Sequence, residues 1–122
     1  MHNRTILFVE DEPLVRECAE LALSMSGYNV VCVEDGVTAM EAAEGMNSDL
    51  QLLITDVALP GILGTDLVKE LRCRYPSLPV IYVSGYDIYT CGVEIEPAES
   101  TAFLQKPYSP AKLIDMVKSF TS

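Results

Sequence analysis

The chain has 122 residues, a length that suits one domain and leaves no room for a second domain with a core of its own. Its hydrophobic content of 49% is typical of a folded globular protein and argues against disorder. Its net charge of −10 disfavours direct contact with nucleic acid or anionic lipid, and no apolar run reaches the roughly 20 residues that cross a bilayer.

Short apolar segments alternate with longer amphipathic segments along the chain. Segments without polar alternation are typical of strands in a parallel sheet that helices cover on both faces. Five strands are therefore predicted, and in chain order they include residues 6–9, 30–33, 52–54, 80–83 and 102–104.

Helices are predicted in the intervening segments, because apolar residues there recur at steps of three and four. Pro13 suits the first turn of the first helix, Gly27 its end, and Gly36 the start of the second. A helix within residues 87–100 is expected to be short, irregular or mobile, because this segment contains a glycine and a proline. The residues that show the helical period are Val15, Cys18, Ala22 and Met25, then Val37, Met40 and Ala43, then Leu67 and Leu71, and finally Leu113, Val117 and Phe120.

The four cysteines, Cys18, Cys32, Cys73 and Cys91, lie far apart in the sequence. Zinc sites usually take their ligands in close pairs, so a zinc site is disfavoured. The first three cysteines fall in predicted helices or strands, where a thiol packs as a small buried hydrophobe. The N-terminal apolar stretch is too short for a secretory signal, so we expect a cytoplasmic protein with reduced thiols.

The alternation of strands and helices predicts one α/β domain over residues 1–122, with a parallel sheet between two helical layers. In such a sheet, ligands bind beyond the carboxyl ends of the strands. We therefore expect one polar site at that edge. The polar residues that end the predicted strands are Glu10, Asp11, Asp56, Ser84 and Lys106.

Three of these residues, Glu10, Asp11 and Asp56, would bring like charges together. At an effective dielectric constant near 20, two unit charges about 4 Å apart repel by about 4 kcal/mol, so such a cluster stays ionised only beside a positive group. Oxygen ligands at a solvent-exposed edge of the sheet suit Mg²⁺, or Mn²⁺ in its place. The alternative is that the acidic residues only stabilise the start of the next helix through its dipole.

Lys106 and Ser84 would make this edge suitable for a phosphoryl group. During phosphoryl transfer, negative charge spreads over the equatorial oxygens, and a metal ion, an ammonium group and a hydroxyl can each stabilise one of them. Asp56 would then be the nucleophile that forms an aspartyl phosphate. The alternatives are a strand-end serine that bonds its own backbone and an exposed surface lysine.

The ordered segments ILFVEDEP, GYNVVCVEDGVTAME, DLQLLITDVALPG, PVIYVSGY and FLQKPYSPAKL resemble the receiver domain of bacterial two-component response regulators. The resemblance covers nearly the whole chain. It implies a flavodoxin-like three-layer α/β sandwich with strand order 2-1-3-4-5 and about five helices, the fourth short or irregular. It also implies a signalling domain rather than an enzyme. The segments VSGY and LQKPYSP favour a place in a longer hybrid histidine kinase, and that longer chain would be an enzyme.

The resemblance assigns the metal site and the phosphoacceptor to particular residues. Asp56 matches the phosphoacceptor, and Asp11 matches the carboxylate that binds Mg²⁺ directly together with Asp56. Glu10, where receivers often have Asp, would act on the metal through water. Ala58 would offer its backbone carbonyl to the metal, and Lys106 would assist the transfer.

The resemblance also implies a conformational switch. Ser84 matches the hydroxyl that moves towards the new phosphoryl group, and Phe103 matches the aromatic residue that then turns inward. The peptide bond between Lys106 and Pro107 is often cis in the family. Tyr86 is expected to shield the phosphoryl group from water.

The expected partner is a histidine kinase or a histidine phosphotransfer protein that donates the phosphoryl group. Phosphorylation would change the face made by residues 87–100, the last strand and the last helix, and so its preference for a protein partner or a dimer. The alternative is a pseudo-receiver that acts as an interaction module without phosphorylation. A haloacid-dehalogenase phosphatase is disfavoured because Ala58 replaces its second acid, and a flavodoxin because the loop EDEP would repel a phosphate.

Overall fold

The computed structural model describes residues 4–46, 49–85 and 100–121. Within these ranges the strands are β1 (Thr5–Val9), β2 (Asn29–Val33), β3 (Leu50–Asp56), β4 (Val80–Ser84) and β5 (Thr101–Gln105). The helices are α1 (Pro13–Met25), α2 (Gly36–Glu44), α3 (Gly64–Arg74) and α4 (Pro110–Thr121). The helix expected within residues 87–100, the thiol of Cys91 and the shielding role of Tyr86 concern residues outside these ranges.

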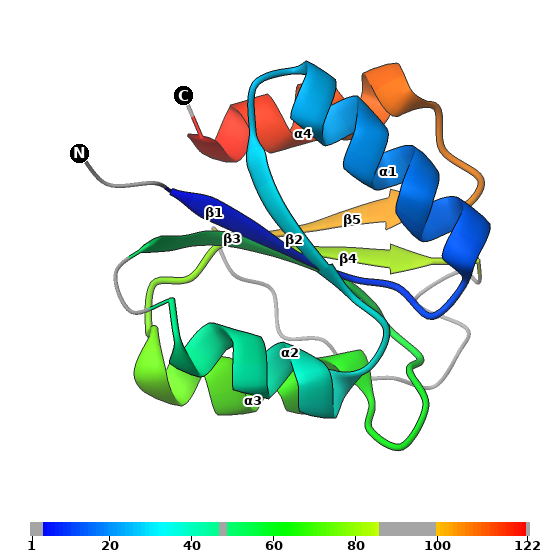
Figure 1. Ribbon diagram of the computed structural model, residues 1–122. Helices are drawn as coiled ribbons and strands as arrows, with labels where there is room; N and C mark the ends of the chain where they lie inside the picture. The colour runs from blue at the N-terminus through cyan, green and yellow to red at the C-terminus, as the bar shows by residue number, and fades with distance from the viewer. Residues whose placement is uncertain (1–3, 47–48, 86–99, 122) are drawn as a thin grey trace.

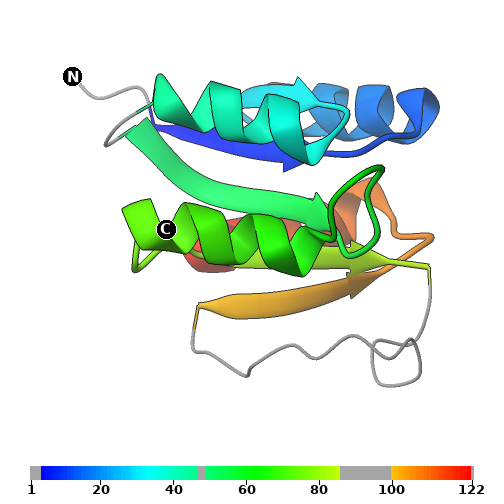
Figure 2. The same cartoon turned by 90° about the horizontal axis from the view of Figure 1, so that it is seen from below.

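The five strands form one parallel sheet in the order β2-β1-β3-β4-β5, which confirms the predicted topology. Helices α1 and α4 cover one face of the sheet, and α2 and α3 cover the other (Figure 1). The arrows of β3, β4 and β5 end at the same side of the molecule (Figure 2). The fold is therefore the expected three-layer sandwich, and the carboxyl ends of its strands meet at one edge. No helix among the described residues is both long and apolar enough to span a bilayer.

Alternate residues of the central strands fill two separate cores. Leu7 and Leu53 face α2 and α3, where they pack in a cluster with Leu67. Phe8 and Ile54 face the opposite way and pack in a cluster with residues of α1 and α4. Because successive strand residues point to opposite faces, a strand that is apolar throughout can serve both cores at once.

The expectation of burial on both faces is wrong for the two edge strands. β2 alternates between exposed and partly buried residues before its buried last residue, Val33, and β5 has one buried residue, Leu104. The two helices on each face cover the middle of the sheet, so β1, β3 and β4 are buried while the edges keep contact with solvent (Figure 1).

The helical period in the first helix predicts the element correctly but not its buried face. α1 buries Ala19 and Leu23 against the sheet, whereas Met25 is 80% exposed. Cys18 and Cys73 are also exposed, so the prediction that they are buried is wrong, and Cys32 is only partly buried. Helix α1 has apolar residues on more than one side, and spacing alone cannot say which side meets the sheet. The three thiols are free.

The predicted helix boundaries follow local backbone requirements. Gly27 has a φ of 91° just after α1, a conformation that glycine adopts without steric cost. α2 begins at Gly36, and the Asp35 carboxylate accepts a hydrogen bond of 2.8 Å from the backbone N–H of Thr38. This bond lowers the pKa of the Asp35 carboxyl group.

Truncation of a core residue tests the two-core arrangement. Leu53→Ala is expected to lower the free energy of unfolding by about 2–5 kcal/mol, because it leaves a cavity beneath α2 and α3. Val31→Ala, on the exposed edge strand, is the control and should cost less than about 1 kcal/mol in a urea titration. Equal losses for the two variants would contradict the assignment of buried and edge strands.

Candidate functional site

The register of β1 and β3 places two carboxylates side by side. Val9 pairs with Thr55 in the last described step of this parallel ladder. The next residue of each segment is acidic, Glu10 after Val9 and Asp56 after Thr55. Glu10 stays in line with β1, because its backbone N–H donates a 3.0 Å hydrogen bond to the carbonyl of Val33 in β2.

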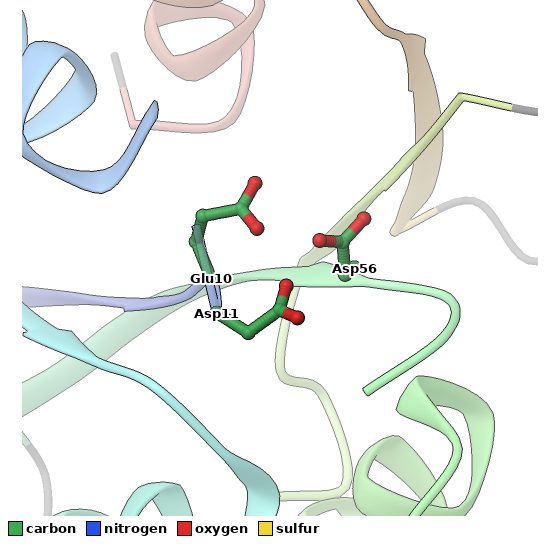
Figure 3. Close-up of side chains that lie close together, drawn as sticks. All are labelled: Glu10, Asp11 and Asp56. Carbon is green, nitrogen blue, oxygen red and sulfur yellow. The ribbon is translucent and has the colours of Figure 1, made fainter. Parts of the chain in front are cut away.

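Three carboxylates meet at this edge of the sheet. Glu10 and Asp11 follow β1, Asp56 ends β3, and the side chains of the first two point towards Asp56 (Figure 3). One carboxylate oxygen from each lies within 4.8 Å of the others. Glu10 is 1% exposed and Asp56 is 8% exposed, whereas Asp11 is exposed to solvent. The cluster is thus closed on the side of the core and open on the side of Asp11.

The ammonium group of Lys106 lies between two of these carboxylates. Its Nζ is 2.5 Å from Oε1 of Glu10 and 3.0 Å from Oδ2 of Asp56. The lysine follows β5, and its backbone N–H donates a 2.8 Å hydrogen bond to the carbonyl of Ser84 at the end of β4. Its peptide bond to Pro107 is cis, as the resemblance implies.

The charges of this cluster change the acidity of its members. Burial raises the pKa of the Glu10 carboxyl group to about 7, and the neighbouring Asp56 adds to the effect, whereas Lys106 opposes it. Burial by itself would lower the pKa of Lys106, but its bonds with Glu10 and Asp56 outweigh burial and raise it. Lys106 therefore stays positively charged, and Glu10 holds a proton in the absence of a metal ion up to near neutral pH.

The two residues expected to form the switch lie on neighbouring strands, Ser84 at the end of β4 and Phe103 in the middle of β5. Ser84 ends β4 and is 6% exposed. Phe103 lies in the edge strand β5 and is 38% exposed. Its ring stacks on that of Tyr82 in β4, with centroids 5.7 Å apart and an interplanar angle of 17°. Phe103 is therefore turned outward in this structure.

The loop after β3 carries Ala58 along the same edge. Ala58 is exposed and forms an isolated antiparallel bridge with Leu63, which closes the loop. Gly61, at the turn, has a φ of 81°. The loop ends where Gly64 begins α3 and donates a 2.7 Å hydrogen bond to the Val57 carbonyl. The loop thus leaves and rejoins the sheet next to Asp56.

The side chains of this cluster fit a magnesium ion. All of its donors are oxygens, which Mg²⁺ prefers, and the exposed side at Asp11 leaves space for the water molecules that Mg²⁺ retains. The buried side chain of Glu10 already binds Lys106 through one oxygen and accepts a 3.3 Å hydrogen bond from the Glu12 N–H through the other. Asp11 and Asp56 are therefore better suited than Glu10 to bind a metal directly.

A groove of about 610 Å³ adjoins the cluster on the side of α1 and α4. Leu14 and Val15 of α1 line it together with Lys106 and Tyr108, so the lysine is shared by the groove and the acidic cluster. Leu14 is 76% exposed. The buried hydroxyl of Tyr108 has no hydrogen-bond partner among the described residues, and burial, with the charge of Glu10, raises its pKa to about 12.

Two features of the site have no signal in the sequence. The guanidinium group of Arg16 donates a 2.8 Å hydrogen bond to the backbone carbonyl of Glu10, which ties α1 to the end of β1. The groove combines residues of α1 with residues about 90 positions later, and the sequence pattern gives no indication that they line one depression.

Comparison with known families gives a match to the response regulator receiver domain over residues 6–118. Among curated proteins, the chain is 35% identical over 116 residues to the sensor kinase CckA of Brucella abortus, which covers 95% of this chain and 12% of that protein. It is 32% identical over 110 residues to the probable transcriptional regulatory protein TcrX of Mycobacterium tuberculosis, covering 90% of this chain and 46% of that protein. The chain thus spans less than half the length of both relatives.

Solved structures show the same similarity. The receiver domain of the hybrid histidine kinase CckA superposes with a TM-score of 0.83 at 36% identity, covering 97% of this chain and 99% of that domain. The response regulator protein TrrA of Thermotoga maritima, in complex with Mg(2+)-BeF, superposes with a TM-score of 0.82 at 27% identity. That superposition covers 96% of this chain and 98% of TrrA.

The raised pKa of Glu10 predicts a pH dependence of stability in metal-free solution. Because the folded state keeps a proton that the unfolded state releases above its ordinary pKa of 4.5, the free energy of unfolding should fall as pH rises from about 4.5 to about 7. The fall is on the order of 3 kcal/mol, and Glu10→Gln should remove most of it. Urea titrations in EDTA from pH 4.5 to 8 measure this, with Glu17→Gln on the surface of α1 as the control. The same slope in all three chains would contradict the assignment.

Proposed function

The chain belongs to the response regulator receiver domain family, and from that premise we propose that Asp56 accepts a phosphoryl group from a phosphohistidine donor in a Mg²⁺-dependent step. The observation that carries the proposal is the convergence of three carboxylates and the Lys106 ammonium group at the carboxyl edge of the sheet. The family is a signalling domain rather than a conventional enzyme, so the phosphorylated state itself is the product. The proposal includes a cytoplasmic location, as the sequence predicts.

In this reaction, a carboxylate oxygen of Asp56 attacks the phosphorus atom. The bond from phosphorus to the donor's imidazole nitrogen breaks, a bond to the Asp56 oxygen forms, and the product is an aspartyl phosphate. Lys106, 3.0 Å from Oδ2 of Asp56, is in position to neutralise charge on the phosphoryl oxygens. Later attack by water on the aspartyl phosphate would restore the carboxylate and release inorganic phosphate.

Asp11, Asp56 and the backbone carbonyl of Ala58 would hold the Mg²⁺ ion, with Glu10 acting through water. When bound, the ion supplies positive charge that offsets the repulsion between the carboxylates and the incoming phosphoryl group. The Mg(2+)-BeF complex of TrrA, a protein of the same fold, supports this assignment. The buried bond between Glu10 and Lys106 would keep the lysine aligned with Asp56.

We also propose that phosphorylation moves Ser84 towards the phosphoryl group and that Phe103 then turns inward. The proposal is supported by their places on the paired strands β4 and β5 and by the outward position of Phe103 on Tyr82. Phe103 has no hydroxyl, so its signal would come from packing. The phosphoryl group would act by favouring one of two arrangements of the edge strand. The face that includes β5 and α4 would then bind a protein partner or a second copy with changed affinity.

The groove beside Lys106 supports a protein as the phosphoryl donor. A histidine kinase or a histidine phosphotransfer protein could seat an apolar helix there, and because Lys106 lines both groove and site, the donor's histidine would lie near Asp56. The match to one domain of a sensor kinase supports a place in a longer hybrid histidine kinase. Such a parent chain would be an enzyme.

Acetyl phosphate labelling tests the acceptor and the metal requirement. The unsubstituted chain should form one acid-stable, alkali-labile phosphoryl adduct with Mg²⁺ or Mn²⁺ and none in EDTA, whereas Asp56→Asn should form none. Lys106→Ala should label roughly 100-fold more slowly, since it removes a charge from the reaction site. Asp66→Asn, an exposed acid of α3, is the control and should label normally. If the unsubstituted chain is folded and stays unlabelled with Mg²⁺, the result would favour the pseudo-receiver instead.

The switch can be tested with beryllium fluoride as a phosphoryl mimic and fluorophenylalanine in place of the three phenylalanines. The ¹⁹F resonance that Phe103→Leu removes should shift when Mg²⁺ and beryllium fluoride are added. Ser84→Ala should abolish this shift while Asp56 still labels, and Ser24→Ala, at an exposed serine of α1, should leave it unchanged. A shift that persists in Ser84→Ala would refute the coupling between Ser84 and Phe103.

A further inference from the structure

The first residue of α2 lies directly against the loop that follows Asp56. A Cβ atom added to Gly36 would overlap with Cγ2 of Ile62 and lie 3.6 Å from its Cβ. Gly36 does not have a positive φ, unlike Gly27 and Gly61, so its backbone conformation does not require glycine. What the position requires is space for Ile62.

Glycine at this position is unfavourable for the helix itself. Alanine has the higher helix propensity, and Asp35 already caps the helix through Thr38. The absence of a side chain at Gly36 is therefore explained by the contact with Ile62 rather than by the needs of α2.

The contact bears on the proposed metal site through the backbone of the loop. Ile62 precedes Leu63, and Leu63 forms the antiparallel bridge with Ala58 that closes the loop. A displacement of Ile62 would thus be passed through Leu63 to the backbone of Ala58. Because Ile62 is β-branched, its Cγ2 cannot move away without a change of rotamer or of backbone.

We infer that Gly36 and Ile62 are positioning residues, whose contact fixes the loop 57–63 so that the Ala58 carbonyl can bind the metal. This inference rests on the proposed function, since it assigns a role towards the proposed Mg²⁺ site. It also makes α2, which contributes no ligand to that site, a determinant of metal affinity.

A second glycine holds the other end of the loop in a different way. A Cβ atom on Gly64 would overlap with the backbone carbonyl oxygen of Asp56, which no side-chain rotation can relieve. A substitution at Gly64 must therefore move the main chain of the phosphoacceptor. The overlap at Gly36, by contrast, is with a side chain, and a smaller residue at position 62 relieves it.

This difference makes a rescue experiment possible. Gly36→Ala is expected to weaken Mg²⁺ binding roughly tenfold, as loss of support around a metal ligand typically does. Ile62→Ala alone should have a smaller effect, and the double variant should bind Mg²⁺ within about twofold of Ile62→Ala, because the overlap is gone. Gly45→Ala is the matched control, since a Cβ at the other end of α2 would make only an ordinary 3.8 Å contact.

Mg²⁺ affinity is measured by titration of the ¹⁵N-labelled chain, with urea unfolding in EDTA to confirm that each variant is folded. The amide shifts of Ala58 and Leu63 in metal-free solution are the second readout. They should change in Gly36→Ala and return in the double variant towards those of Ile62→Ala.

Wild-type Mg²⁺ affinity in Gly36→Ala, or a defect that Ile62→Ala does not rescue, would overturn the inference. Absence of Mg²⁺ binding to the unsubstituted chain would instead overturn the proposed metal site. In that case, the metal-free amide shifts still decide whether Gly36 and Ile62 position the loop.

Discussion

The parallel pairing of β1 with β3 is the constraint on which the rest of the site depends. Both strands are buried on both faces, so a slip of one residue would exchange the side chains that face the two cores. The packing of the interior therefore fixes the register, and the register sets Glu10 beside Asp56. Hydrophobic packing thus holds the two carboxylates together, although their proximity does not stabilise the fold. The rest of the site compensates for their repulsion.

That compensation is only partial in the absence of a metal ion. Lys106 brings one positive charge to two buried or nearly buried carboxylates and an exposed third, Asp11. Burial, with the neighbouring Asp56, raises the pKa of the Glu10 carboxyl group in spite of Lys106. A divalent cation bound at the open side would add positive charge there and favour the ionised form of Glu10, so metal binding would be coupled to the release of a proton.

Much of this arrangement could be predicted from the sequence, because period and strand-end residues are local signals. The apolar runs gave the five strands, and parallel strands bring their polar ends to one edge whatever their order. The pattern could not give the exposure of Cys18 and Met25, because α1 has apolar residues on more than one side. It could not give the open faces of β2 either, because these depend on how far the neighbouring helices extend over the sheet. The contact of Gly36 with Ile62 also joins residues without a periodic relation, and coordinates were needed to find it.

The position of Phe103 follows from the same difference between the centre and the edge of the sheet. A side chain can exchange an outward for an inward position only where one of its sides is free of close packing, because a filled interior tolerates few rearrangements. β1, β3 and β4 offer no such freedom, since each is buried along its length. β5 does, because it pairs on one side with β4 and buries only Leu104. The proposed inward turn of Phe103 would therefore take place on an edge strand, and it would break the stack on Tyr82.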